Sequence, residues 1–210
     1  MKKLLLYIAA LLITVNTSAQ NKADVFDESQ PITWLGLDFT QVKFIGNAAQ
    51  WQDAGEITNS QMRDKYFPAW NNLFLNEKDK YKVADAVRRT EVDYAIEITE
   101  KANNAIKGNF FESDANMYQL LDEQKVAALV KKYDFKGKSG IGFMFFVEGM
   151  SKGKEEGSMW ATFVDMKSKT VLLTQRVTGK SGGFGFRNYW AKTFLNGLKE
   201  VKNDWKSWKK

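Results

Sequence analysis

The sequence predicts an α+β protein, a two-layer sandwich of one mixed, mostly antiparallel sheet of about five strands with helices packed on one face. Three observations lead to this prediction. Short apolar segments with strand-like alternation recur along the chain. Two of them, near the end, are separated by a polar turn typical of a hairpin, and a long amphipathic segment closes the chain. The elements are expected in the order β-α-β-α-β-β-β-α.

The chain begins with the pattern of a signal peptide. Lys2 and Lys3 precede an apolar run over residues 4–15 that is too short to span a bilayer comfortably. Small residues around Ala19 suit a cleavage site, so we expect cleavage after Ala19 or Gln20. The alternative is an uncleaved N-terminal anchor. With cleavage, the pattern predicts an exported protein, periplasmic or secreted.

We therefore divide the chain into a signal peptide (1–20), a flexible polar leader (21–31) and one α+β domain (32–210). Without Lys2 and Lys3 of the predicted signal peptide, the chain has 29 basic and 25 acidic residues, because the full count is 31 and 25. A net charge of +4 indicates solubility rather than nucleic-acid binding. No apolar run after the signal peptide has membrane-spanning length.

Two residue types are absent from the chain, histidine and cysteine. Nucleophile systems that use a Ser-His or Cys-His pair are therefore excluded, as are zinc sites built from imidazole or thiolate ligands. Disulfides are excluded too, so the fold depends on its core. These absences favour a non-enzymatic protein without a cofactor or a metal.

The first strand is expected over residues 34–45. Its alternation begins on Leu35 and shifts register before Val42, which predicts a bulge or a strand break. A helical region follows over 60–76, and Pro68 divides it. Because proline is favoured in the first turn of a helix and disruptive inside one, we expect a kink or a new helix starting near that residue.

Residues 91–99 alternate cleanly, which predicts a strand with one buried face. Residues 101–118 are mostly polar and predict a loop with a helical turn. Asp122 is suited to cap a helix over 123–133.

The densest apolar segments follow. Residues 141–147 are apolar on both faces, which is typical of a central strand covered on both sides. Residues 158–166 and 170–178 flank a polar turn and predict a hairpin. The closing helix is expected to start near Arg187.

A glycine-rich loop over residues 178–186 connects the last strand to this helix. It does not fit a phosphate-binding loop, because Thr174 stands where the first glycine of that motif is needed, and Asn188 replaces the third glycine of a dinucleotide fingerprint. Two interpretations stay open: an anion site served by Lys180 and Arg187, or a flexible turn.

The seven tryptophans allow a sugar-binding platform, and Trp34 and Trp51 are the ones placed most freely for it. Burial is the alternative. Carboxylates on or beside strands could form a glycosidase pair or a solvated sheet face; they are Asp38, Asp93, Glu97, Glu148 and Asp165. The candidate ligand-binding residues are Lys180, Arg187, Asn188, Trp34, Trp51 and Asp165.

The closing helix carries one continuous apolar stripe formed by Trp190, Phe194, Leu198, Val201, Trp205 and Trp208. We expect the stripe to dock on the sheet. The last turn, with Trp205 and Trp208 among lysines, could instead make weak contact with an anionic membrane surface.

Three segments, 140–148, 163–173 and 183–191, resemble a family of exported Bacteroidetes proteins of unknown function. The motif Gly-Phe-Gly-Phe-Arg-Asn-Tyr-Trp at 183–190 carries the resemblance. It implies export but no activity and no site residue. The order of elements is also similar to envelope domains of the TolB N-terminal and CsgG-like kinds, which is a likeness of fold alone.

The sequence thus favours an exported cell-envelope protein that acts as a non-catalytic binding or assembly module. Its partner would be an envelope protein or a glycan. The alternative is a carbohydrate-binding or carboxylate-only glycan-active protein.

Overall fold

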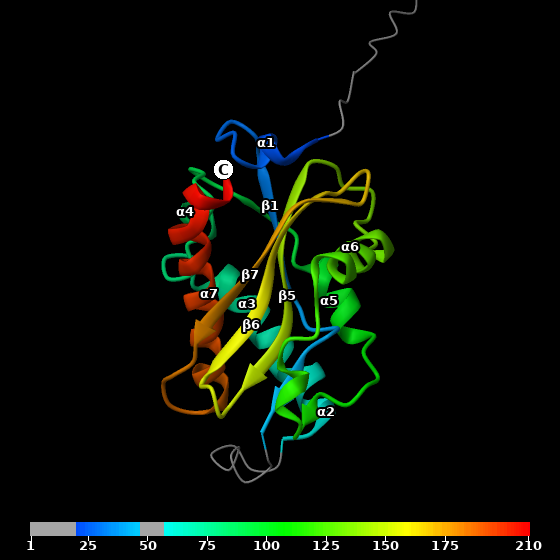
Figure 1. The fold of residues 1–210 in the computed structure, drawn as a ribbon, viewed down its shortest axis with the longest axis vertical. Helices are drawn as coiled ribbons and strands as arrows, with labels where there is room; N and C mark the ends of the chain where they lie inside the picture. Colours follow the sequence, from blue (N-terminus) through cyan, green and yellow to red (C-terminus); the bar gives the residue numbers. More distant parts are fainter. Residues whose placement is uncertain (1–19, 47–56) are drawn as a thin grey trace, which may run out of the picture.

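The computed structural model describes residues 20–46 and 57–210, which form one seven-stranded sheet with helices around it. Strand β5 (Ile141–Ser151) lies at its centre and is buried along its whole length. Figure 1 shows β5 running through the middle of the molecule, with β6 (Glu156–Asp165) and β7 (Thr170–Lys180) beside it. The segment predicted as a signal peptide (1–20) lies outside the described residues, apart from Gln20.

The sheet is mixed, and parallel pairing dominates one side of β5. Strands β1 (Ile32–Asp38) and β2 (Lys43–Ile45) both pair with β5 in parallel, β1 along its first half and β2 along its last residues. Because β6 occupies the other edge of β5, β1 and β2 lie end to end along a single edge. Two short parallel strands, β3 (Asp93–Tyr94) and β4 (Phe111–Glu112), extend β1 and β2 outward.

The prediction of a mostly antiparallel sheet of about five strands is therefore wrong. The five strands β3, β1, β5, β2 and β4 are all parallel, and only the β5-β6-β7 extension is antiparallel. Alternation along a strand shows which side chains share a face. It carries no information about the direction of the neighbouring strand, and this is why the prediction failed.

Helices cover both faces of the sheet, not one as predicted. One face packs against α3 (Phe67–Asn76), α4 (Val83–Ala86) and α7 (Phe186–Trp208), and the other against α5 (Glu97–Asn104) and α6 (Glu123–Lys132). Figure 1 shows α4 and α7 to the left of the strands and α5 and α6 to their right. On β5, Phe143 and Phe145 belong to the first core, whereas Met144 and Phe146 belong to the second. The apolar character of both faces of β5 reflects these two cores.

The predicted break in the first strand is confirmed. The pairing of β1 with β5 shifts between Trp34 and Gly36, and the strand ends at Asp38 before resuming at Lys43 as β2. Gly36 has a φ of 100°, and a Cβ at this position would come within 2.5 Å of the Thr99 hydroxyl. The bulge brings β1 into close contact with α5.

The strand predicted over 91–99 is mostly wrong, because only Asp93 and Tyr94 pair and α5 begins at Glu97. Two polar residues on α5 explain the difference. The hydroxyl of Thr99 donates to the carbonyl of Leu35, and the amide group of Asn103 bonds the backbone of β1. Tertiary hydrogen bonds from a helix thus outweigh a local alternation typical of a strand.

Of the two outcomes expected around Pro68, a kink or a new helix, the structure has a new helix. A short α2 (Asn59–Gln61) leads into a π-helical turn (Met62–Tyr66), and α3 starts at Phe67 with the proline in its first turn. Asp122 caps α6 as predicted, by accepting a hydrogen bond from the amide of Lys125. The polar segment predicted as a loop with a helical turn ends in a 3-10 turn (Ala115–Tyr118).

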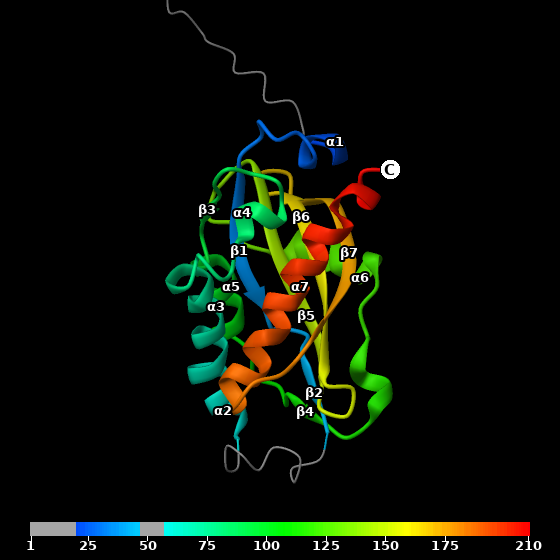
Figure 2. The same cartoon turned by 90° about the vertical axis from the view of Figure 1, so that its left-hand side faces the viewer.

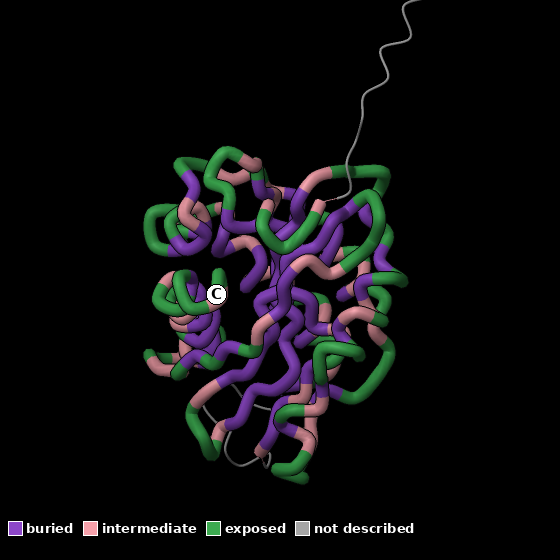
Figure 3. Tube along the Cα trace, turned by 45° about the horizontal axis from the view of Figure 1, so that its top comes forward, coloured by how far each residue is buried: buried purple, intermediate pink, exposed green. Residues whose placement is uncertain are grey.

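Part of the polar leader, predicted as flexible, is helical and packed on the domain. Residues Lys22–Val25 form the short helix α1, and Val25 and Phe26 are buried. Phe26 packs edge-on against Trp205 near the end of α7, with 5.0 Å between ring centroids. Figure 3 shows that burial concentrates along the central strands and the inner sides of the helices, while the connecting loops are exposed.

Within the described ranges 20–46 and 57–210, no helix is both long enough and apolar enough to cross a membrane.

Candidate functional site

Two of the three ligand-binding residues predicted at or beside the glycine-rich loop lie in the first turn of α7. Arg187 and Asn188 line a common cavity of about 390 Å³ with Lys65 and Tyr66. Lys180 does not line it, and its ammonium group instead pairs with Glu156 at 2.9 Å. Arg187 also bonds the Asn188 side chain at 3.2 Å. Lys180 and Arg187, the two residues of the anion-site interpretation, therefore do not share this cavity.

The predicted aromatic platform is not formed by Trp34. This side chain is fully buried and stacks on Phe74, with 4.7 Å between ring centroids. Trp51 lies outside the described residues. Trp205 is buried as well, which leaves Trp208 as the half-buried tryptophan of the last helical turn.

Three of the cavities in the described part of the chain are each large enough to hold a small molecule. One is the cavity beside Arg187, a second of about 320 Å³ lies between α3 and α7, and a third of about 360 Å³ lies between α5 and α6. None of these three is lined by a tryptophan, so none offers a sugar-binding platform.

Asp165 has a structural role at the β6–β7 turn. Its carboxylate accepts hydrogen bonds from the amides of Lys167 and Ser168 at 2.9 and 3.2 Å. Burial alone would raise the pKa of Asp165, but hydrogen bonds from Ser168 and Lys167 outweigh burial and lower it. The carboxylate is thus used within the turn and lines none of the three cavities.

One of the three cavities lies between α5, α6 and the end of β1. Its volume of about 360 Å³ is within the range of small-molecule sites. We call it the Asp38 pocket. It is lined by Asp38, Thr40, Gln41, Ile98, Lys101, Ala102, Ala105, Leu129, Lys132, Tyr133 and Asp134.

The position of the Asp38 pocket follows from the topology. Asp38 is the last residue of β1, whose neighbours β3 and β5 are both parallel to it. In open sheets with parallel strands, ligands bind outside the carboxyl ends of the strands. The helix after β3 supplies one wall and the C-terminal end of α6 supplies the other.

Asp38 is buried at the base of this pocket and is held by neutral donors. The Tyr133 hydroxyl donates to Oδ2 at 2.5 Å, and the Thr40 amide and hydroxyl donate to Oδ1 at 2.7 and 2.6 Å. Burial raises the pKa of Asp38 above its ordinary value, although these donors oppose the shift. Burial, together with the nearby Asp38 carboxylate, also raises the pKa of Tyr133, so its hydroxyl keeps its proton.

The walls of the pocket are apolar and its rim is basic. Ile98 and Leu129 belong to the hydrophobic core on this face of the sheet or pack against it. At the rim, Lys101 pairs with Asp134 at 2.8 Å. Lys132 makes no ion pair or hydrogen bond within the described part of the chain, and its ammonium group is thus available to a ligand.

A second buried carboxylate, Glu148, lies on the same face of the sheet but is fully satisfied. It accepts hydrogen bonds from Arg176 and Ser158, both at 2.7 Å, and from the amide of Leu121 at 3.0 Å. The guanidinium of Arg176 lies 4.7 Å from the Trp160 ring. This cluster ties the segment before α6 to the sheet and lines none of the three cavities.

The carboxylates considered for a glycosidase pair do not converge on any of these cavities. Asp38 is the only one of the five predicted strand carboxylates that lines one of the three. In the described residues, no group of three or more acidic side chains is arranged to hold a metal ion.

Most of the Asp38 pocket is not predictable from the sequence. The helical pattern predicts Tyr133 only as an inward side chain, and nothing in the sequence singles out Lys101 or Lys132 among the many lysines. The available signal is Asp38 itself, an acidic residue that ends an apolar strand.

The chain matches no protein-family model, no curated protein and no solved structure. The geometry of the Asp38 pocket is therefore the basis for a proposed function.

Proposed function

We propose that the mature chain is an exported, non-catalytic binding module of the cell envelope whose ligand occupies the Asp38 pocket. One observation carries the proposal. A cavity of about 360 Å³ with apolar walls opens at the carboxyl end of a parallel strand, above a buried Asp38–Tyr133 pair.

The lining of the pocket suits a small amphipathic anion. Ile98, Ala102 and Leu129 offer contact to an apolar body. Lys132 offers an unpaired ammonium at the rim, and a hydrogen bond to a charged group is stronger than one between neutral groups.

The arrangement supports binding rather than catalysis. Asp38 is poorly placed to act as a base, because it is buried, Oδ1 accepts two hydrogen bonds from Thr40 and Oδ2 accepts one from Tyr133, which leaves a single lone pair free. The chain contains no histidine or cysteine that could act in its place. The buried pair instead gives the pocket a rigid polar base.

A binding experiment tests the proposal. A panel of aliphatic and aromatic monocarboxylates, each with its neutral amide analogue, is titrated against residues 20–210 and followed by NMR and thermal shift. We expect carboxylates to bind, Leu129→Trp to abolish binding by filling the cavity, and Lys132→Ala to weaken carboxylates about tenfold without affecting the amides.

Lys131→Ala is the matched control, because Lys131 is the neighbouring exposed lysine of α6 and does not line the pocket. Binding should be unchanged in this variant. The proposal is wrong if no carboxylate of the panel binds, or if Leu129→Trp binds as the unmodified chain does.

A further inference from the structure

Phe184, at the apex of the glycine-rich loop, is exposed to an unusual degree. Its side chain is 92% exposed, and it is the one large hydrophobic residue exposed in this way among residues 20–46 and 57–210. Figure 1 shows the loop between β7 and α7 at the lower end of the molecule, away from the C-terminus. An isolated exposed apolar side chain needs no explanation by itself. Whether Phe184 belongs to a binding surface therefore depends on the residues around it.

The loop that carries Phe184 is anchored at both ends. The amide of Ser181 donates to the carbonyl of Glu155 at 2.8 Å, and the amide of Gly182 donates to the carbonyl of Tyr189 at 3.1 Å. Three glycines have positive φ, at 151° for Gly182, 106° for Gly183 and 77° for Gly185, a conformation that side chains other than glycine rarely adopt. The backbone therefore presents Phe184 outward from a fixed base.

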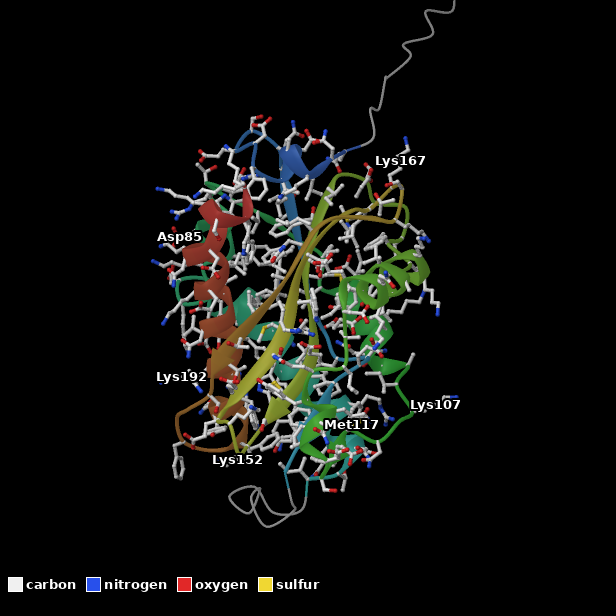
Figure 4. All side chains as sticks on the ribbon, viewed as in Figure 1. Asp85, Lys107, Met117, Lys152, Lys167 and Lys192 are labelled. Carbon is white, nitrogen blue, oxygen red and sulfur yellow. The ribbon has the colours of Figure 1, made fainter. Side chains whose placement is uncertain are left out.

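Cations surround this base. Lys192 lies 3.4 Å from the place where a Cβ of Gly182 would be, and Lys152 lies 3.7 Å from the centre of the Tyr189 ring. Figure 4 labels both lysines. The basic residues of the loop, the adjacent β5–β6 turn and the first two turns of α7 are Lys152, Lys154, Lys180, Arg187 and Lys192, against the two carboxylates of Glu155 and Glu156. Five cations against two carboxylates give the region a net charge of +3.

We propose that this loop contacts an anionic lipid surface, with the Phe184 ring inserted at the level of the headgroups and the surrounding cations on lipid phosphates. A single aromatic ring framed by lysines is the combination that favours interfacial binding. The cores of protein–protein interfaces are depleted of lysine, so the composition of the region favours lipid over protein. The proposal is independent of the Asp38 pocket, which lies on the opposite face of the sheet.

The proposal places membrane contact at the other end of α7 from the sequence-based expectation. Trp205 is buried, and α7 extends over 23 residues, a length of about 35 Å. The last turn and the Phe184 loop therefore lie far apart.

A vesicle experiment tests the proposal. Residues 20–210 are sedimented with neutral phosphatidylcholine vesicles and with vesicles containing about 30 mol % phosphatidylglycerol, at low and high salt. We expect binding to the anionic vesicles alone and its loss at high salt. Phe184→Ser should weaken partition about tenfold with an unchanged melting temperature, because the ring makes little contact within the protein.

The absence of cysteine allows a position-specific readout. An environment-sensitive fluorophore on Phe184→Cys should shift to the blue with anionic vesicles. The same fluorophore on Ser168→Cys, in the exposed β6–β7 turn, should not. Equal partition of Phe184→Ser and the unmodified chain, or no binding to the anionic vesicles, overturns the proposal. A dimer that Phe184→Ser dissociates would also overturn it, in favour of contact between copies.

Discussion

At the scale of single residues, two buried carboxylates on one face of the sheet are stabilised differently. Glu148 has a cationic partner, because Arg176 lies 2.7 Å from it. Asp38 has only the neutral donors Thr40 and Tyr133, and its pKa is raised by burial. A buried carboxylate without a cation is the less favourable of the two, so Asp38 should make stability depend on pH.

We predict the sign of that dependence. Because the pKa of Asp38 is higher in the folded chain than its ordinary value of 3.8, the folded state retains the proton as pH rises above that value. The stability that Asp38 contributes by holding this proton is fully present below pH 3.8 and is lost as pH rises through the folded pKa. Over that range the free energy of unfolding falls by at most about 1.4 kcal/mol per pH unit. Asp38→Asn should remove this slope in urea unfolding measured across the acidic range. An identical pH profile in both chains would contradict the prediction.

At the scale of elements, α7 approaches β7 closely enough that only glycine fits between them. A Cβ on Gly179 would overlap the carbonyl oxygen of Thr193 and would lie 2.9 Å from the amide nitrogen of Gly197. Gly197 of α7 in turn faces the side chain of Met159 in β6. The position of the closing helix on the sheet therefore depends on these glycines.

Gly179→Ala should destabilise the protein by about 3 kcal/mol, because backbone atoms of α7 must move to admit the methyl group. The matched control is Gly153→Ala in the β5–β6 turn, where a Cβ would meet no atom within 4 Å. The control should stay within about 0.5 kcal/mol of the unmodified chain in urea unfolding. Equal stability of the two variants would show that α7 is not held by this contact.

At the scale of the whole molecule, the segment that precedes β1 and the C-terminal helix stabilise each other. Phe26, just after α1, packs on Trp205 near the end of α7, and Trp205 in turn packs on Phe163 of β6. Arg89 bonds the carbonyls of Val25 and Gln30 at 3.0 and 2.8 Å. Figure 2 shows α1 and the C-terminus at the same end of the molecule.

Removal of the leader should therefore lower the free energy of unfolding. A chain that starts at Pro31 loses the burial of Val25 and Phe26, and we expect it to unfold with about 3 kcal/mol less free energy than a chain that starts at Gln20. Urea unfolding of the two chains measures the difference. Equal midpoints would mean that the leader contributes no stability, which is the result expected of a flexible segment.

The elements that could be predicted from the sequence are those that local chemistry specifies. The cap of α6 at Asp122, the β6–β7 hairpin with its polar turn, and the start of α7 after the glycine-rich loop all follow from nearby residues. The absence of histidine and cysteine likewise excludes whole classes of chemistry on composition alone.

The association of these elements depends instead on tertiary contacts. The parallel pairing of β1 and β2 with β5, and the second layer of helices, rest on contacts between segments far apart in the chain. The Asp38 pocket has the same origin, because its walls come from α5 and α6 and its base from β1. Alternation and capping report only on nearest neighbours in sequence, whereas strand direction, layer order and the pocket are set by packing over long separations.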